Sequence, residues 1–248
     1  MKNRKKRLMK IGAIIAVIAV AGIAGGVVIC KGANRFELTV AGDLISKEEY
    51  VNCMNSVEYD TKIQIQQDYD AVYGTDFWEK QYDGQYGYEI LARNTVEQLK
   101  YIHAVYNLAE ENGDVEDSCY EALEKRWKDG NAERSEKVKK GEVIYGLKEY
   151  TFQLYLDYEL STLKEKYCND TSREGMQLTE DEVLQHYQSR DWIFGGSEEK
   201  ADLETARIAV ERELREQKYD DMITQRENGS QVEGNMKDVN RYTLKNIQ

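Results

Sequence analysis

Proline is absent from all 248 residues, so no position carries the ring that removes a backbone N–H donor and interrupts a helix. Apolar residues recur at spacings of three and four over long stretches, which is the period of an amphipathic helix. Little of the sequence shows the alternation that is typical of strands. The sequence therefore predicts a mainly α fold.

Histidine and cysteine are scarce, with two and four residues. His103 and His186 both fall in predicted helices, and the three cysteines beyond the N-terminal region, Cys53, Cys119 and Cys168, form no C-x-x-C pair. An odd number of cysteines without close-paired histidines supports neither a disulfide framework nor a zinc site. We expect no metal, no other cofactor and at most one intramolecular disulfide.

Motifs of catalysis are also missing. The sequence contains no G-x-S-x-G, no H-E-x-x-H and no cysteine–histidine arrangement typical of a nucleophile. A wall hydrolase would need only two carboxylates, for which Glu48, Glu49, Glu142 and Glu149 are candidates. Acidic residues are so abundant that most are expected on solvated helix faces. We therefore predict no catalytic residue, and a hydrolase stays an alternative.

Positive charge is in short supply outside the amino end. The chain has 34 basic and 46 acidic residues, and residues 1–10 contain six of the basic ones and no acidic one. Beyond them 28 basic residues stand against 46 acidic ones, a net charge of −18. A chain this acidic binds nucleic acid poorly and is repelled by anionic lipid. We therefore expect no nucleic-acid partner.

A single long apolar run is present, at residues 11–30. The run is uncharged, and twenty helical residues span about 30 Å, the hydrocarbon thickness of a bilayer. The basic residues before it hold the amino end inside the cell. We expect a single-pass protein of the bacterial cell membrane, with residues 1–10 as a cytoplasmic tail, residues 11–30 as a transmembrane signal anchor and the remainder extracytoplasmic.

Other interpretations of the apolar run stay open. A cleaved signal peptide usually has a shorter apolar region before a site of small residues, whereas this run continues through Ile29. Lipidation of Cys30 would follow signal cleavage, but Ile29 stands where that processing takes Gly, Ala or Ser. Gly22 and Gly26 form a G-x-x-x-G spacing that would allow two such helices to pack as a homodimer.

Six helices are expected after the apolar run. The first opens at a capping box, in which Ser46 and Glu49 satisfy each other's backbone donors, and it runs towards Tyr73. Thr179 and Glu182 form a second capping box, which opens a short helix. The other predicted helices are one through Leu99 and Ala109 that ends at Gly113, one over 117–128, one over 147–167 and one over 203–227. The charged run 129–140 is either helix or loop.

Two apolar stripes mark the helix expected at 147–167. One stripe contains Leu147, Tyr150, Leu154 and Tyr158, and the other contains Phe152, Leu156, Leu160, Leu163 and Tyr167. A helix that is apolar on two sides must be covered on both, so we expect this helix at the centre of the core. Strand candidates are limited to residues 36–44 and 232–244, which could form one short pair of β-strands.

The order of these pieces resembles a known family, the SurA/PrsA extracytoplasmic chaperones. The segments that carry the resemblance are GDLISKEEY at 42–50, the block at 90–120, LTEDEV at 178–183 with Tyr187, and Leu214 with Lys218. The resemblance covers residues 36–232 and implies a SurA N-terminal-type domain of several helices. Residues 233–248 would then be a C-terminal tail.

One domain that complete members of that family contain is missing here. Complete members carry a parvulin-type prolyl isomerase domain before the last long helix, where this chain has only the thirteen residues 190–202, far below the about 40 at which chains begin to fold unaided. The resemblance thus implies a chaperone lobe without the isomerase, which binds unfolded or newly exported polypeptides without ATP or metal. An envelope scaffold or adaptor for one specific protein is the alternative function.

Tyrosine is the dominant aromatic residue, with 18 Tyr against 4 Phe and 3 Trp. Its flat ring with a polar end suits adaptable contacts with many sequences. Six aromatic residues crowd one stretch broken by glycines, and we predict them as the client-binding site: Tyr69, Tyr73, Phe77, Trp78, Tyr82 and Tyr86. Packing of these rings on the core is the alternative.

Overall fold

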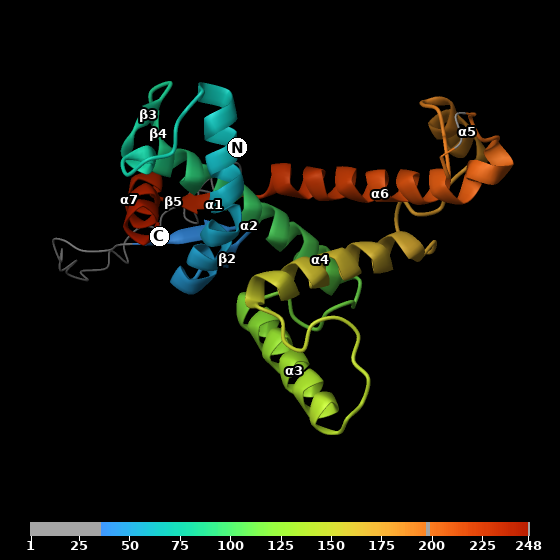
Figure 1. Cartoon of the computed structure of the whole chain (residues 1–248), viewed down its shortest axis with the longest axis horizontal. Coiled ribbons are helices and arrows are strands. Elements are labelled where there is room, and N and C mark those ends of the chain that lie inside the picture. The colour runs from blue at the N-terminus through green and yellow to red at the C-terminus, as the bar shows by residue number, and fades with distance from the viewer. Residues whose placement is uncertain (1–35, 197–198, 248) are drawn as a thin grey trace, which may run out of the picture. The chain divides into compact units, whose positions relative to one another are not determined.

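The computed structural model describes residues 36–196 and 199–247, and the predicted anchor at residues 11–30 lies outside them. Seven α-helices dominate this part of the chain, which confirms the mainly α fold (Figure 1). None of the helices described is both long and apolar enough to cross a membrane. The helices are α1 (Lys47–Tyr69), α2 (Gly87–Glu111), α3 (Tyr120–Lys139), α4 (Phe152–Asn169), α5 (Glu180–Gln188), α6 (Leu203–Gly229) and α7 (Met236–Asn246). The shorter elements are β1 (Leu38–Val40), β2 (Asp43–Leu44), the 3₁₀ turn η1 (Phe77–Glu79), β3 (Gln81–Tyr82), β4 (Gln85–Tyr86) and β5 (Val232–Gly234).

Both predicted capping boxes are present. At the start of α1 the Glu49 N–H donates to Ser46 Oγ at 3.1 Å, and the Ser46 N–H donates to Glu49 Oε2 at 3.4 Å. At the start of α5 the Thr179 N–H donates to Glu182 Oε2 at 2.8 Å, and the Glu182 N–H donates to Thr179 Oγ1 at 3.3 Å. Each box satisfies donors that the first turn of a helix leaves unpaired, so these two helix starts are encoded locally.

The lengths of α1 and α3 can be compared with the prediction from the sequence. α1 ends at Tyr69 instead of continuing towards Tyr73, because Asp70 takes a left-handed conformation with a φ of 51°. α3 runs to Lys139, so the charged run at 129–140 is helical almost to its end.

The central helix of the core is α2. It contacts α1, α4, α6 and α7, and its buried side chains include Leu91, Leu99 and Val105. Our prediction that the helix at 147–167 would occupy the centre is wrong, because only one of its two apolar stripes is covered. The buried members of that helix are Leu156, Leu160, Leu163 and Tyr167, whereas Leu147, Leu154 and Tyr158 of the other stripe are exposed.

The start of α4 also differs from the prediction. The helix begins at Phe152, since Thr151 has extended backbone and its Oγ1 accepts the N–H of Leu154 at 3.3 Å. Leu147 therefore lies in the loop that precedes the helix. The apolar periodicity continues through that loop, and for this reason the sequence placed the helix start too early.

The predicted strand pairing is confirmed, although the second strand is short. β1 pairs antiparallel with both β2 and β5. After Gly234 the chain continues as α7, so the strand expected up to residue 244 is wrong beyond that point. α7 buries Val239, Tyr242 and Thr243, and Tyr50 Oη lies 2.5 Å from Thr243 Oγ1. The folded body thus extends into the segment that was expected to be a C-terminal tail.

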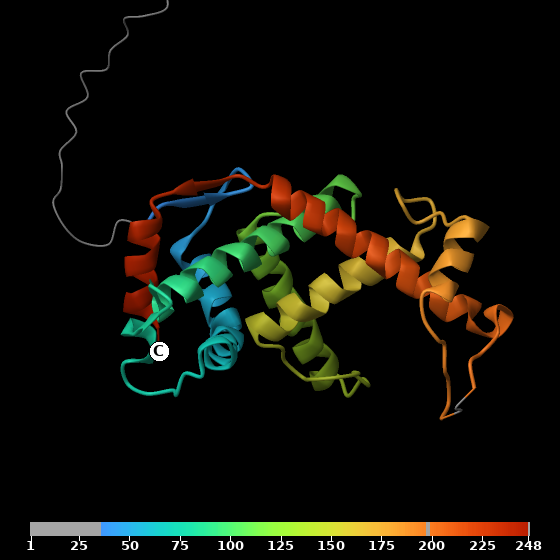
Figure 2. The same cartoon turned by 90° about the horizontal axis from the view of Figure 1, so that it is seen from above.

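Within the part of the chain that the structure describes, buried apolar side chains form two separate cores. The large core involves α1, α2, α4, α7 and the second half of α6, and the small core lies between α5 and the first half of α6. Figure 2 shows α5 beside the first half of α6. Members of the small core are Val183, Trp192, Ala206 and Val210. Trp192 comes from the connection at 190–202, and its indole N–H donates to the Tyr187 carbonyl at 3.0 Å. This connection therefore contributes its tryptophan to the small core.

Candidate functional site

The six predicted client-binding residues divide between the core and the surface. Phe77, Trp78 and Tyr82 are only 1%, 8% and 4% exposed, Tyr86 is half-buried, and Tyr69 and Tyr73 are exposed. Three of the six rings therefore belong to the core, as in the alternative that the sequence left open. Only the exposed rings offer contact area to a client in this structure.

Close packing explains why the Phe77–Trp78 turn is buried. A Cβ on Gly87, the first residue of α2, would stand 2.9 Å from the Phe77 carbonyl oxygen and 3.0 Å from Trp78 Cα. The rings of Phe77 and Trp78 meet edge to face at 5.0 Å, and Tyr82 Oη donates to the Phe77 carbonyl at 2.9 Å. The absence of a side chain at Gly87 thus lets η1 approach α2 and turn its rings inward.

Two exposed rings of this region, those of Tyr59 and Tyr73, lie around one lysine. Lys62 Nζ lies 4.9 Å from the ring centroid of Tyr59 and 4.9 Å from that of Tyr73. Tyr59 is exposed as well, although the sequence did not single it out. We define the α1 aromatic surface as Tyr59, Tyr69 and Tyr73.

A second apolar surface lies on α4 and on the loop before it. We define this α3–α4 surface by five exposed residues, Val143, Tyr145, Leu147, Leu154 and Tyr158, of which Tyr145 is 88% exposed. The ring of Tyr150 stacks on that of Tyr158 at 5.9 Å and brings the loop beside the helix. Three of the five residues, Leu147, Leu154 and Tyr158, belong to the stripe that we expected to be covered, and no described part of the chain covers them.

Hydrogen bonds from α3 hold the loop in place. Asn131 Nδ2 donates to the Tyr150 carbonyl at 2.9 Å, and Asn131 Oδ1 accepts from the Tyr150 N–H at 2.9 Å. The Trp127 indole N–H donates to the same carbonyl at 2.7 Å, and Arg134 Nε donates to the Leu147 carbonyl at 2.8 Å. A loop that is fixed before binding loses less conformational entropy when a partner covers it.

A charged network joins α2, α3 and α4. Arg126 Nε and Nη2 donate to the two carboxylate oxygens of Glu159 at 2.9 Å and 3.1 Å. Tyr106 Oη and Tyr155 Oη donate to the same carboxylate at 2.6 Å and 3.0 Å. Burial and the negative charge of Glu159 raise the pKa of both tyrosine hydroxyls, so both stay protonated. The bidentate pair fixes the orientation of α3 against α4, and with it the α3–α4 surface.

His103 is buried between two carboxylates. Its Nδ1 lies 3.1 Å from Asp43 Oδ2 and its Nε2 lies 2.9 Å from Glu49 Oε1. Burial lowers the pKa of His103, but the hydrogen bonds and negative charges of Glu49 and Asp43 outweigh burial and raise this pKa above its ordinary value. In its protonated form the imidazole donates from both nitrogens and ties α2 to the start of α1 and to β2. With both nitrogens engaged, His103 is a structural residue.

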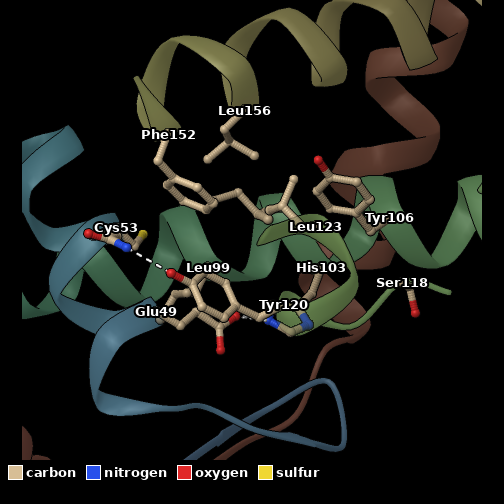
Figure 3. A pocket seen from close by; sticks show the side chains of 12 residues that line it. Glu49, Cys53, Leu99, His103, Tyr106, Ser118, Tyr120, Leu123, Phe152 and Leu156 are labelled. Atoms are coloured by element: carbon tan, nitrogen blue, oxygen red, sulfur yellow. Dashed lines mark hydrogen bonds and ion pairs between the residues drawn. The ribbon is translucent and has the colours of Figure 1, made fainter. Parts of the chain in front are cut away.

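A small cavity adjoins this cluster (Figure 3). Residues of α1 to α4 line it, among them Cys53, Leu99, Leu123 and Leu156, and its volume is ≈ 20 Å³. That volume holds about one water molecule, so the cavity does not admit a sugar or a peptide. Among residues 36–196 and 199–247, no group of three or more His, Cys, Asp or Glu side chains could hold a metal ion.

Comparison with known proteins identifies a relative of this chain. The chain is 31% identical over 195 residues to a chaperone from Bifidobacterium longum subsp. longum, a match that covers 78% of this chain and 70% of the relative. No protein-family profile and no solved structure matches the chain. The similarity to this relative shows that the chain is a chaperone-like protein. The relative is named the chaperone for lacto-N-biosidase, and the chain belongs to the family of that chaperone.

Proposed function

We propose that this chain is a membrane-anchored chaperone that binds one client protein while the client folds. The relative is by name a chaperone for lacto-N-biosidase, and membership of its family supports a client of similar kind for this chain. The resemblance to the SurA/PrsA family supports the same activity, the binding of non-native polypeptide outside the cytoplasm. Binding by apolar contact requires neither ATP nor a metal ion.

The observation that carries the proposal is the ordered, uncovered α3–α4 surface. Complete burial of one large apolar side chain contributes about 1.5–3 kcal/mol. Leu147, Leu154 and Tyr158 are partly buried already, whereas Val143 and Tyr145 have most of their surface to lose. Covering all five side chains would contribute about 6 kcal/mol before the cost of ordering the client. Such a contact holds a client transiently and releases it as the client buries its own apolar residues.

A second candidate function is general holding of unfolded exported polypeptides. The α1 aromatic surface favours it, because exposed tyrosines around a lysine make contacts that tolerate many sequences. The name of the relative favours a dedicated client. Breadth of binding separates the two functions.

The proposed location is the outer side of the bacterial cell membrane, with residues 11–30 as the anchor and the amino end inside. The six basic residues in 1–10 and the uncharged run that follows support this placement. Pairing of two anchors through Gly22 and Gly26 would make a homodimer and belongs to the same proposal.

A refolding assay tests the proposed function. The full chain, purified in detergent, is added to chemically denatured lacto-N-biosidase and to two unrelated denatured proteins, and recovered activity and light scattering are measured after dilution. We expect recovery of lacto-N-biosidase to rise and the unrelated proteins to aggregate as they do without the chain. Equal protection of all three would support general holding, and protection of none would refute a chaperone function.

Two surface variants locate the contact in the same assay. Tyr145→Ser with Leu154→Ser and Tyr158→Ser changes the α3–α4 surface, and Tyr59→Ser with Tyr69→Ser and Tyr73→Ser changes the α1 aromatic surface. All six side chains are exposed, so both variants should keep their helical content and thermal midpoint. We expect the first variant to lose client recovery and the second to keep it. The reverse result would place the client on the α1 aromatic surface, which includes Tyr69 and Tyr73 of the site predicted from the sequence.

A further inference from the structure

We infer that the α1 aromatic surface binds a polypeptide segment that contains arginine or lysine. The proposed function places the client on the α3–α4 surface, so this inference adds a second site on another part of the molecule. Its partner is cationic, whereas the α3–α4 surface offers apolar contact.

A cation already lies between two exposed rings of this surface. Lys62 Nζ is 4.9 Å from the ring centroids of both Tyr59 and Tyr73. The two tyrosines are 64% and 51% exposed, so a partner can reach both rings. A positive charge over an aromatic face is attracted by the quadrupole of the ring. The pair of rings therefore suits one cation, and the chain fills it with its own lysine.

Aromatic rings continue from this pair to the end of α1. The Tyr73 ring lies 5.1 Å from the Phe77 ring. The Tyr82 ring lies 5.6 Å from both the Phe77 ring and the Tyr69 ring, and Figure 1 shows the end of α1 beside β3 and β4. Phe77 and Tyr82 are buried and support the two exposed tyrosines from below. A segment of several residues, and not only a single side chain, therefore finds contact here.

Carboxylates accompany these rings. Residues 58–83 contain seven acidic residues and only two basic ones. Burial and the negative charge of Asp76 raise the pKa of Tyr82, so this carboxylate lies close to the linked rings. Three exposed aspartates each follow or precede one of these rings in the sequence: Asp70, Asp76 and Asp83.

The three aspartates are available to a partner. Among residues 36–196 and 199–247 they form no ion pair, whereas on α3 a lysine three or four residues away pairs with most acidic side chains. The opposing positive charges are Lys62, Lys80 and Arg93, whose Nη1 donates to Gln85 Oε1 in β4 at 3.0 Å. Three positive charges against seven negative ones leave the region acidic, and its charge is complementary to that of a basic segment.

Arginine is the side chain that this combination fits best. Its guanidinium is planar, stacks on aromatic faces and donates hydrogen bonds to carboxylates in a bidentate geometry. The contact of Lys62 with the two rings is exposed and therefore weak. An arginine of the partner thus replaces Lys62 between the rings while neighbouring aspartates accept its hydrogen bonds.

Fluorescence anisotropy of labelled peptides with the full chain in a nonionic detergent tests the inference. The first short peptide alternates arginine with serine, the second has lysine in place of arginine, and the third has glutamine there. We expect the arginine peptide to bind best, the lysine peptide to bind about threefold more weakly and the glutamine peptide not to bind. High salt should weaken binding of both charged peptides. Equal binding of all three peptides, or binding of none, would overturn the inference.

Variants of the rings separate ring contact from net charge. Tyr59→Ser with Tyr69→Ser and Tyr73→Ser leaves the net charge unchanged and should abolish binding of the arginine peptide. Lys62→Gln should raise its affinity about threefold, because the rings are then free of the internal cation. Unchanged or weaker binding by Lys62→Gln would contradict a cation site at these two rings.

Variants of the carboxylates locate the charge. Asp70→Asn with Asp76→Asn and Asp83→Asn should weaken binding of the arginine peptide about eightfold, since each exposed ion pair contributes a factor of about two. A matched control removes three exposed carboxylates from α5 and α6 and should keep the affinity: Asp181→Asn, Glu204→Gln and Asp221→Asn. Equal weakening in both variants would show a general effect of negative charge and overturn the site.

Client refolding by the same variants separates this inference from the proposed function. Loss of peptide binding together with normal refolding would support a second site. A chain that refolds its client and binds none of the peptides would refute only the inference. A chain that binds the arginine peptide and refolds no client would refute only the proposed function.

Discussion

Removal of His103 should leave a carboxylate buried without its positive partner. The His103 and Glu49 side chains are 6% and 9% exposed, whereas the Asp43 side chain is 56% exposed. Breaking a buried ion pair by removing one partner costs about 3–5 kcal/mol, and an exposed pair contributes at most about 1 kcal/mol. The Ser46 N–H still donates to Glu49 after the change. We therefore expect His103→Leu to lower the free energy of unfolding by about 3 kcal/mol.

Urea unfolding of residues 34–248, which form one compact unit, measures this loss by circular dichroism. The same substitution in a Glu49→Gln background is the matched control, because the buried group there is neutral. We expect His103→Leu to cost only about 1–2 kcal/mol in that background. A loss below about 1 kcal/mol in the parent protein, or the same loss in both backgrounds, would refute a buried ion pair.

The pH dependence of the same pair has a definite sign. The pKa of His103 in the folded protein is raised above its ordinary value of 6.5. The protonated imidazole therefore stabilises the fold fully below 6.5, and this contribution is lost as the pH rises through the raised pKa. The stability difference between the parent protein and His103→Leu should shrink over that interval. A difference that grows with pH would contradict the assignment.

Three further predictions concern packing and thiol reactivity. Phe77→Ala should lower the free energy of unfolding by about 3–5 kcal/mol in urea melts, because the ring is buried, whereas a surface role would leave the melt unchanged. Gly87→Ala should cost about 1–3 kcal/mol in the same assay, since its Cβ would meet the Phe77 carbonyl at 2.9 Å, and a neutral result would contradict the close approach. In thiol labelling of residues 34–248, the exposed Cys119 should react at once, whereas the buried Cys53 and Cys168 should react only on unfolding. Burial shields these two thiols from the reagent and raises the pKa of both. Equal labelling rates for all three thiols would refute this burial.

Local signals in the sequence were sufficient to predict two helix starts, those of α1 and α5. Ser46 with Glu49 and Thr179 with Glu182 act within four consecutive residues, so no distant contact is needed to form either capping box. The pairing of the first strand with residues after 232 could also be predicted, because little other strand signal was available. The capping boxes depend only on the chain near each residue, whereas the strand pairing joins Leu38 to Gly234.

The position of the core could not be predicted in the same way. The two stripes of α4 have the same period, and the positions of α2, α3 and α6, on which α4 packs, decide that Leu160 is buried and Tyr158 exposed. Likewise, the burial of Phe77 depends on the approach to Gly87 across the turn, which a count of aromatic residues does not reveal. The sequence therefore showed the second apolar stripe of α4 as a pattern, but it did not show that the side chains of this stripe are exposed.

α6 joins the two cores as one continuous helix. Its 27 residues reach about 40 Å, with Ala206 and Val210 in the small core and Tyr219 and Ile223 in the large one. The small core contains few buried side chains, so it is expected to open at a lower free energy than the large core. Such an opening would expose Trp192 and Val183 while α2 and its neighbours stay folded. Local unfolding at one end of α6 would thus make the apolar side chains of the small core accessible, while the fold of the large core stays the same.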